Sequence, residues 1–332
     1  MNLNKINKNI VLIADRVDNF KNVDLSSDHL ELIEDRYFED ISNGLSSICQ
    51  NVIYYDSPAS FLENITQHKD DIVFSIWSGR KSRNRRALVP SMCEAYGISY
   101  VGADTYANII CQDKILSKQF SLRNGINTPN YLFYEGGNLD ELLIKTLKLP
   151  LVIKPNFEGG SIGISKDCLV KSYEEALSKA SELFSIFKQP ILIEEFIKGK
   201  EVSIVIMGDQ EKILFCEVVE LFIQNNAYDL ENNILSFEVK KKSMDTMVLL
   251  HRLITCDFPN DILNKSISLF KNLGKAEELR IDGKFDGENF YLIELSPDIH
   301  FGKSATFAEA FNLKNIKYTE MLHMILLNAG NR

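Results

Sequence analysis

The first hundred residues alternate short apolar runs with longer stretches of helical periodicity. Apolar runs occupy residues 10–14, 52–55, 72–76 and 100–102, and helical patterns lie at 28–48 and 88–96. Strands that alternate with helices in this way predict an open parallel sheet, because parallel neighbours need a crossover between them. No GxGxxG follows the first run, so the dinucleotide-binding fingerprint is absent from the sequence.

The pattern becomes mixed after about residue 105. A helical segment is expected at 107–123, and strands are expected at 150–155, 190–197 and 201–207, with more strands to about residue 219. Ser172 and Glu175 have the spacing of a capping box before a helix over 173–187. The polar segment 224–233 predicts a long loop, and helices are expected at 261–275 and 307–328. The fold class is therefore α/β followed by α+β.

A β-hairpin is predicted over residues 280–302, with Asp286-Gly287 at its turn. Because side chains alternate between the faces of a strand, Arg280 and Asp282 share one face. On the return strand Leu292, Glu294 and Ser296 are expected to share a face. Two carboxylates with phosphate oxygens form a typical magnesium site, and the alternative is the polar outer face of an ordinary hairpin.

Composition limits the classes of function. The 332 residues are 45% hydrophobic and 25% charged, as in soluble globular proteins, and suffice for two or three domains. A net charge of −9 argues against nucleic-acid partners, which need a cationic surface. The apolar run at 10–14 is too short for a signal or a membrane span. The six scattered cysteines form no metal-binding pattern and predict buried, reduced residues of a cytoplasmic protein.

Two further segments carry groups that bind nucleotides in many proteins. The loop at 158–163 holds three glycines and Ser161, and Lys154 ends the strand before it. Glycines let backbone N–H groups converge on phosphate oxygens, although most such segments are merely turns. Glu194 and Glu195 end another apolar strand, with Glu201 shortly after, and this end is either an adenosine site or a solvated hairpin end.

Taken together, these segments resemble the ATP-grasp superfamily, and D-alanine–D-alanine ligases in particular. The resemblance rests on Asp113-Lys114, Val152-Ile-Lys154-Pro155, the loop 158–163, Ile193-Glu-Glu-Phe-Ile197 with Glu201, Arg280-Ile-Asp282 and Ile293-Glu-Leu-Ser296. It covers residues 100–208 and 280–297 well and is poor elsewhere. It implies an ATP-grasp fold with an N-terminal open parallel-sheet (pre-ATP-grasp) domain at 1–104, a central lobe at 105–190 and a C-terminal lobe with the metal site at 191–332.

The resemblance also implies a role for each matching residue. ATP phosphates would be neutralised by Lys114 and Lys154 and covered by Ser161; adenosine would meet Glu194, Glu195, Ile197, Glu201 and Ile293; magnesium, or manganese, would bind Asp282, Glu294 and Ser296; and Arg280 would stabilise the transferred phosphoryl group. The family reaction forms an acyl phosphate that an amine then attacks. Such chemistry needs positioning and charge neutralisation rather than a protein nucleophile.

Several positions depart from the family pattern. Ser296 stands where the family has Asn, Gly160 and Ala305 stand where it has Ser, and Asp15 to Asp18 lack its donor-binding Glu. The family's acidic loop is replaced by 77–86, in which five of the last seven residues are Lys or Arg. Clustered arginines suit anionic substrates, although the loop is equally well explained as a solvated one. The residues expected on the substrate are Arg83, Arg85, Arg86, Tyr228, Asp298 and His300.

These departures argue against D-Ala–D-Ala synthesis. The predicted function is an ADP-forming ligase that joins a small-molecule carboxylate to an amine, such as amino acids or small peptides, with ATP and one or two Mg²⁺. One alternative is an ATP-grasp enzyme that acylates a carrier-protein thiol or cyclises one substrate. Another, motivated by Ser296, is a nucleotide-binding protein without catalysis. Partners would be small molecules, with a carrier protein or a second copy in a homodimer as alternatives, and no nucleic acid or membrane.

Overall fold

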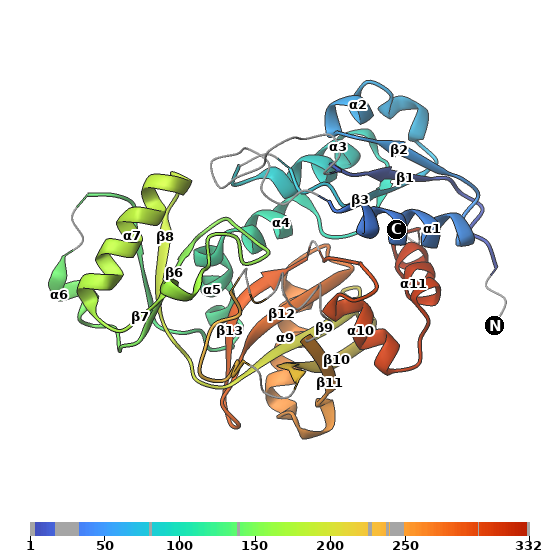
Figure 1. The fold of residues 1–332 in the computed structure, drawn as a ribbon. Coiled ribbons are helices and arrows are strands. Elements are labelled where there is room, and N and C mark those ends of the chain that lie inside the picture. The colour runs from blue at the N-terminus through green and yellow to red at the C-terminus, as the bar shows by residue number, and fades with distance from the viewer. Residues whose placement is uncertain are drawn as a thin grey trace.

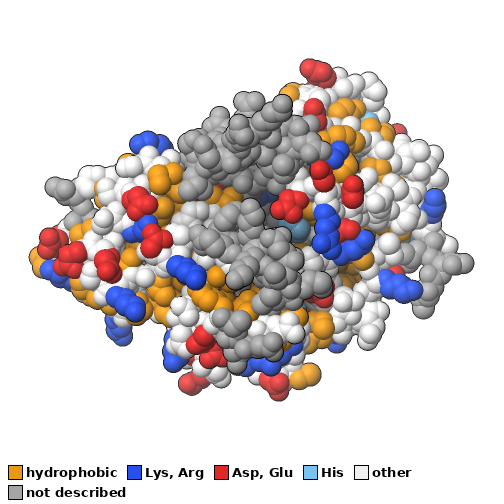
Figure 2. All heavy atoms as spheres, viewed as in Figure 1, with side chains coloured by type: hydrophobic (Ala, Val, Ile, Leu, Met, Phe, Trp, Pro, Cys, Tyr) orange, Lys and Arg blue, Asp and Glu red, His pale blue; other side chains and the backbone are white. Residues whose placement is uncertain are grey.

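The computed structural model describes residues 4–16, 33–79, 82–137, 140–224, 228–236, 239, 249–297 and 299–330. Asp298 and the first two cations of the basic loop lie outside these residues. Among the helices described, none is both long and apolar enough to cross a membrane. Figure 2 shows acidic and basic side chains interspersed over one face, where the described residues form no broad basic surface.

Four parallel strands form the first sheet, as the alternating pattern predicts. They are β1 (Ile10–Ile13), β2 (Val52–Tyr55), β3 (Ile72–Ser75) and β4 (Ser99–Tyr100), in the order β2-β1-β3-β4. Helices α1 (Asp35–Ile48), α2 (Pro58–Leu62) and α3 (Leu88–Tyr96) connect them. Every residue of β1 is buried, because apolar side chains pack on both faces of this strand.

The second sheet is antiparallel and forms the lobe that carries α7 in Figure 1. Its strands β5 (Tyr131–Tyr134), β6 (Leu151–Pro155), β7 (Leu169–Val170) and β8 (Ile191–Glu195) follow the order β5-β8-β6-β7. Helix α7 (Tyr173–Phe187) packs its apolar side chains on this sheet, and the short α6 (Glu141–Ile144) lies nearby. The predicted capping box is present, since Ser172 and Glu175 bond each other's backbone N–H groups.

The segment 107–123 forms two helices rather than the single one expected. They are α4 (Thr105–Gln112) and α5 (Lys114–Arg123), separated by Asp113 in an extended conformation. The Asp113 carboxylate accepts hydrogen bonds from the backbone of Ile115 at 3.0 Å and Leu116 at 3.1 Å. This N-cap stabilises the start of a new helix and places Lys114 at its first position.

Five antiparallel strands form the third sheet. They are β9 (Lys200–Gly208), β10 (Ile213–Ile223), β11 (Leu249–Leu253), β12 (Glu278–Phe285) and β13 (Phe290–Ser296), in the order β11-β10-β9-β12-β13. Side chains of α4 and α9 (Asn260–Asn272) bury one face, and α10 (Thr306–Leu313) buries part of the other. The other face of β12 and β13 carries the polar residues of the predicted hairpin.

The C-terminal segment returns to the first sheet. The helix expected over 307–328 is two helices, α10 and α11 (Tyr318–Gly330), and α11 packs against α1 (Figure 1). Leu322 and Ile325 of α11 share one core with Ile41 and Leu45 of α1. Gly44 lies at this contact, where an added Cβ would stand 2.5 Å from Leu322 Cδ1. The predicted domain boundaries stay a prediction. The last helix, which they assign to the C-terminal lobe, packs in the core of the first sheet.

The expectation that all six cysteines are core residues is wrong for two of them. Cys256 is exposed and Cys216 is partly exposed, whereas the other four are buried. Cys256 lies in the short helical turn Thr255–Asp257, which follows edge strand β11.

Candidate active site

A β-bulge in the hairpin sets the geometry of the site. Arg280 pairs with Ser296 and Asp282 with Glu294, but Gly283 pairs with Leu292, so the register skips Ile293. The skipped residue turns Leu292 to the opposite face, where it is fully buried in the core beneath α4 and α9. The hairpin is confirmed, whereas the expectation that Leu292 shares a face with Glu294 is wrong.

The two hairpin carboxylates lie directly across the strand ladder from each other. Asp282 binds the Arg280 guanidinium through both oxygens, with Nε–Oδ1 at 2.8 Å and Nη2–Oδ2 at 2.7 Å, and it accepts a 2.6 Å hydrogen bond from Ser203. Glu294 pairs with Lys114 at 3.2 Å. Both carboxylates keep about a quarter of their side-chain surface exposed, at 23% and 27%. Each negative charge is therefore balanced by one cation and remains accessible from solvent.

Glu194 lies fully buried between two lysines. Lys154 of β6 contacts Oε1, and Lys118 of α5 lies 2.7 Å from Oε2. Burial alone raises the pKa of Glu194, but the two ammonium groups outweigh it and hold the pKa below its ordinary value. Burial, together with the charges of Lys154 and Lys114, lowers the pKa of Lys118 to about 8.

Lys118 is a polar residue of the site that the sequence analysis did not identify. It lies four residues after Lys114 on the same helix, a spacing that places both side chains on one face. Its ammonium also lies 3.5 Å from the backbone oxygen of Leu292, so it connects α5, β8 and β13. The four-residue spacing of Lys114 and Lys118 in the sequence is the feature from which Lys118 could have been predicted.

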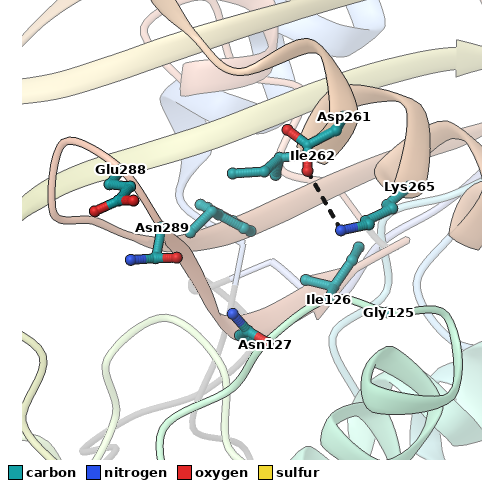
Figure 3. Close-up of a pocket in the computed structure, with 9 residues that line it drawn as sticks. Gly125, Ile126, Asn127, Asp261, Ile262, Lys265, Glu288 and Asn289 are labelled. Carbon is teal, nitrogen blue, oxygen red and sulfur yellow. Dashed lines mark hydrogen bonds and ion pairs between the residues drawn. The ribbon is translucent and has the colours of Figure 1, made fainter.

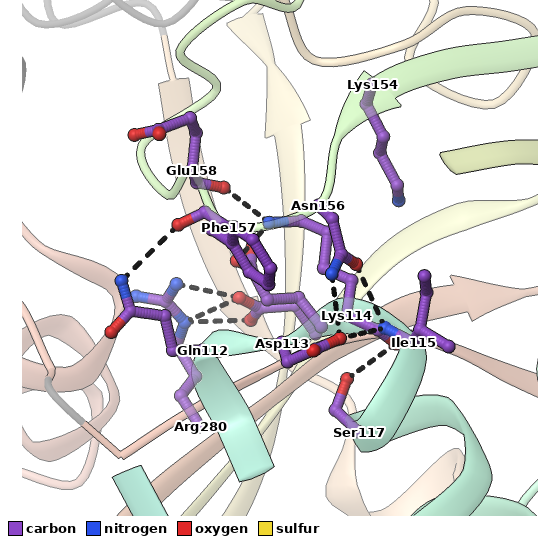
Figure 4. A network of polar contacts seen from close by, with 12 residues as sticks. Gln112, Asp113, Lys114, Ile115, Ser117, Lys154, Asn156, Phe157, Glu158 and Arg280 are labelled. Atoms are coloured by element: carbon purple, nitrogen blue, oxygen red, sulfur yellow. Dashed lines mark hydrogen bonds and ion pairs between the residues drawn. The ribbon is translucent and has the colours of Figure 1, made fainter. Parts of the chain in front are cut away.

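The start of α5 is tied to the loop that follows β6 (Figure 4). Lys114 donates to the backbone oxygen of Glu158, and Asn156 donates to Asp113 at 2.8 Å. The backbone N–H of Ile115 returns a 3.1 Å bond to the Asn156 side chain. One lysine therefore contacts both the loop at 158–163 and the acidic pair of the hairpin.

The glycine-bearing loop adopts the left-handed backbone that its sequence permits. Gly160, Ser161 and Gly163 have φ angles of +60°, +65° and +74°. An added Cβ on Gly163 would lie 2.7 Å from the Phe187 ring, so this position is closed to larger residues. The Ser161 hydroxyl donates to the backbone oxygen of Leu235 at 3.0 Å. This bond joins the loop to the segment 228–236, which we call the covering loop.

The end of β8 divides its two glutamates between opposite sides. Glu194 points into the lysine cluster, while Glu195 accepts bonds from the Lys148 backbone at 2.8 Å and from Asn130 at 3.0 Å. Ile197 and Ile293 are partly buried, and their expected contact with the base stays a prediction. Glu201 pairs with Lys284 at 2.9 Å.

The described arginines of the basic loop, residues 77–86, differ in their burial. Arg85 is buried, with Nη2 at 3.2 Å from both the Glu158 carboxylate and the Phe157 backbone oxygen. Arg83 is exposed and Arg86 is partly buried. Burial raises the pKa of Asp15, an effect that the charge of Arg86 opposes. Arg85 therefore contacts Glu158, the first residue of the loop 158–163, and the substrate roles expected of Arg83, Arg85 and Arg86 stay predictions.

The remaining substrate candidates are only partly described. Tyr228 donates to the backbone oxygen of Ile234 at 3.1 Å within the covering loop. The exposed His300 ring stacks on Tyr37, with centroids 3.8 Å apart, and accepts a bond from Gly302. Asp298 lies outside the described residues, and Ser296 lies on the strand opposite Arg280. Substrate contacts at these positions stay predictions.

A small polar pocket lies on another side of the hairpin (Figure 3). It is bordered by Gly125 to Asn127, by Asp261 and Lys265 of α9, and by Glu288 and Asn289 at the hairpin turn. Asp261 and Lys265 pair at 3.3 Å. Its volume is about 100 Å³, well below the several hundred that a drug-sized ligand fills. We therefore do not assign a nucleotide to it.

Known proteins resemble this chain in the part that holds the candidate site and along most of its length. Residues 122–327 match the family model described as "D-ala D-ala ligase C-terminus". The D-alanine–D-alanine ligase of Carboxydothermus hydrogenoformans is 25% identical over 285 residues, which cover 83% of this chain and 87% of that protein.

Two solved structures share the fold over almost the whole chain. The D-alanine–D-alanine ligase of Bacillus anthracis complexed with ATP has a TM-score of 0.71 and 19% identity, covering 97% of both chains. VanG, the D-Ala:D-Ser ligase of Enterococcus faecalis, has a TM-score of 0.68 and 18% identity, covering 98% of this chain and 100% of that one. These structures confirm the ATP-grasp fold. With the family match over more than half of the sequence, the chain belongs to the D-alanine–D-alanine ligase family of ATP-grasp ligases, enzymes that form carbon–nitrogen bonds.

Proposed function

We propose that this protein is an ADP-forming carboxylate–amine ligase that acts through an acyl phosphate and joins substrates other than two D-alanines. One observation carries the proposal. Lys114 contacts the backbone of the phosphate loop at Glu158 and also the carboxylate of Glu294 in the acidic pair. A single cation thus lies between the groups that would cover the ATP phosphates and those that would hold their metal ion.

The nucleotide would bind between the second and third sheets. Lys114 and Lys154 would neutralise the phosphates, and Ser161 with its left-handed neighbours would direct its hydroxyl and backbone N–H groups at them. Ile197 and Ile293 would border the base, with the backbone at Glu194 and Glu195 along its edge. Glu201 keeps 19% of its side chain exposed and would accept hydrogen bonds from the ribose hydroxyls.

The acidic pair fits a magnesium ion. Asp282 and Glu294 offer two carboxylates across one ladder position, and Ser296 would add a neutral oxygen. The described residues hold no cluster of three carboxylate, histidine or cysteine side chains, so substrate phosphates would complete the shell. A bound magnesium or manganese ion would neutralise phosphate charge, a task that Arg280 and Lys114 share from the protein side.

The residues suit phosphoryl transfer followed by acyl transfer. A substrate carboxylate oxygen would attack the γ-phosphorus of ATP, and ADP would leave. The acceptor amine would then attack the acyl carbon, and phosphate would leave with the formation of the amide. Arg280, with 17% of its side chain exposed, would stabilise negative charge on the transferred phosphoryl group and on the tetrahedral intermediate.

Changes around the substrate end support a different substrate pair. Ala305 precedes α10 and provides no side-chain cap to that helix, at the position where the family resemblance expects a serine on the acceptor. The phosphate loop carries Gly160 in place of another hydroxyl. Structures of this fold include a D-Ala:D-Ser ligase, so the acceptor varies among proteins of similar architecture. We infer that amino acids or small peptides remain the substrate class.

The test is hydroxylamine trapping with Mg-ATP and a panel of amino acids, dicarboxylates and phosphorylated acids. We expect equal amounts of hydroxamate and ADP with one of these donors. Glu294→Gln should abolish both products, whereas Glu288→Gln, at the exposed turn of the same hairpin, should leave them unchanged. ADP release without hydroxamate across the panel would argue against an acyl phosphate. D-alanine as both the preferred donor and the preferred acceptor would refute the substrate proposal.

A further inference from the structure

Lys284 is a buried cation on the polar face of the third sheet. It lies on β12 two residues after Asp282, so both side chains point to the same face. In the adjacent strand β9 it pairs with Glu201, just as Asp282 pairs with Ser203. Only 5% of Lys284 is exposed. Nothing in the phosphate chemistry proposed above uses this ammonium group.

The ammonium group is surrounded by oxygen atoms from two segments. It lies 2.9 Å from Glu201 Oε1 and 3.3 Å from the backbone oxygen of Gly199, where β9 begins. In the covering loop it donates to Leu230 at 2.6 Å and approaches the backbone oxygen of Asn233 at 3.4 Å. One side chain of β12 therefore binds both the start of β9 and the covering loop.

These contacts explain why a charge is tolerated at a buried position. A buried ammonium group is costly unless oxygen acceptors replace its hydration, and here a carboxylate and three carbonyls do so. The same contacts restrict Glu201, because one of its oxygens is held while the side chain remains 19% exposed. A fixed carboxylate with an open side is suited to accept hydrogen bonds from a ligand hydroxyl.

We propose that Lys284 is a positioning residue that gives this site its selectivity for the ribose of the nucleotide. It holds the Glu201 carboxylate toward the ribose hydroxyls and fixes the covering loop at Leu230 and Asn233. The inference rests on the proposed function, which assigns the ribose to Glu201. Lys284 touches neither the reacting phosphate nor the acceptor, and it acts through Glu201.

The experiment measures binding of Mg-ATP, Mg-2′-deoxy-ATP and Mg-3′-deoxy-ATP by calorimetry. We expect the wild-type protein to bind ATP about tenfold more tightly than one deoxy analogue, the effect of one hydrogen bond to a charged group. Glu201→Gln should reduce this ratio, and Lys284→Met should reduce it to within about twofold. Lys284→Arg should retain most of it, because the charge remains.

Lys200→Met is the matched control. Lys200 is adjacent to Glu201 but pairs with Glu220, so the same substitution there should leave the ratio unchanged. If Lys284→Met does not fold, Lys284→Gln, which keeps two donors without charge, replaces it. A merely structural lysine would weaken all three nucleotides equally, and an unchanged ratio in the Lys284 variant would overturn the inference.

The controls separate the inference from the function on which it rests. A wild-type ratio that Glu201→Gln removes and Lys284→Met retains would refute only the role of Lys284. A wild-type protein that does not discriminate among the three nucleotides would overturn the ribose assignment, and the inference with it. Absence of Mg-ATP binding would contradict the proposed function itself.

Discussion

Glu194 shows how neighbouring charge sets the behaviour of a single side chain. Its carboxylate is fully buried, yet Lys118 and Lys154 hold the pKa of Glu194 below its ordinary value. The same burial, with two nearby lysines, lowers the pKa of Lys118 to about 8. Glu194 is tolerated in the interior because these two ammonium groups balance its charge, and its removal would leave the buried Lys118 ammonium without that carboxylate.

His251 on β11 supplies a pH-dependent contribution to stability. Its Nε2 lies 3.2 Å from Thr306 Oγ1, and burial, with the charge of Arg280, lowers the pKa of His251 to about 4 from 6.5. Between these values the unfolded chain binds a proton that the folded protein does not. The free energy of unfolding should therefore fall by up to about 3 kcal/mol as pH falls from 7 to 4.

This prediction is tested by urea unfolding at several pH values. His251→Gln removes the titrating group and should flatten the loss of stability between pH 6.5 and 4. The same change at His323, on α11, should keep the wild-type slope. Equal slopes for wild type and His251→Gln would show that the imidazole charge does not limit stability.

At the scale of elements, the bulge in the β12–β13 hairpin decides which side chains form the site. The register skip at Ile293 keeps Asp282 opposite Glu294 while it sends Leu292 into the core. A regular hairpin would place Leu292 on the polar face and lose the burial of a large apolar side chain. The hydrophobic core and the acidic pair therefore require the same irregularity.

Gly283 is the residue that allows the bulge. An added Cβ would lie 2.4 Å from the backbone oxygen of Tyr291, a contact that only a shift of the strands relieves. Gly283→Ala should lower the free energy of unfolding by about 3 kcal/mol and should weaken binding of Mg-ATP. Urea unfolding measures the loss of stability, and calorimetry measures the binding of Mg-ATP.

Gly287, at the turn of the same hairpin, is the matched control. No atom lies within 4 Å of an added Cβ there, although its φ is +106°. Gly287→Ala should cost about 1 kcal/mol from backbone strain alone and should leave nucleotide binding intact. Equal losses in the two variants would argue against a special role for Gly283.

At the scale of the whole molecule, contacts between distant segments hold the site together. Helix α11 completes the core around α1, and Arg85 reaches from the basic loop to Glu158, the first residue of the loop 158–163. Glu158 also accepts a 2.8 Å bond from Gln189. The first sheet is therefore joined to the lobe that would bind ATP through a buried ion pair.

Because of this ion pair, we predict that replacing Arg85 destabilises the protein. Arg85→Met would leave the Glu158 carboxylate buried beside Gln189 alone and should lower the free energy of unfolding by about 3 kcal/mol. Glu158→Gln in the same chain should recover part of this loss, because the orphaned charge is removed. A double-mutant cycle by urea unfolding measures the coupling.

Arg83, which is exposed, provides the control. Arg83→Met should change stability by less than about 0.5 kcal/mol. A substrate KM that rises in Arg85→Met, without any loss of stability, would instead support the expected role of Arg85 in substrate binding.

Local patterns in the sequence were sufficient for most elements and for the order of the motifs. The alternation of strands and helices predicts the parallel sheet, Asp286-Gly287 predicts the hairpin, and Ser172 with Glu175 predicts the start of α7. These features follow from side-chain periodicity, turn chemistry and capping, which act within a few residues. The residues quoted for the family resemblance likewise include Lys114, Lys154, Asp282 and Glu294, and the fold brings them together.

The partner of each charged side chain was decided only by the tertiary structure. Lys118 at Glu194, Lys284 at Glu201 and Arg85 at Glu158 join residues that are 73 to 83 positions apart. Asp113 broke an expected helix, and a single skipped residue reversed Leu292. Periodicity specifies which side of an element is buried, whereas packing between distant elements selects what each buried group meets. The sequence by itself therefore determined the elements and the candidate chemistry, and the tertiary structure determined the geometry and electrostatics of the site.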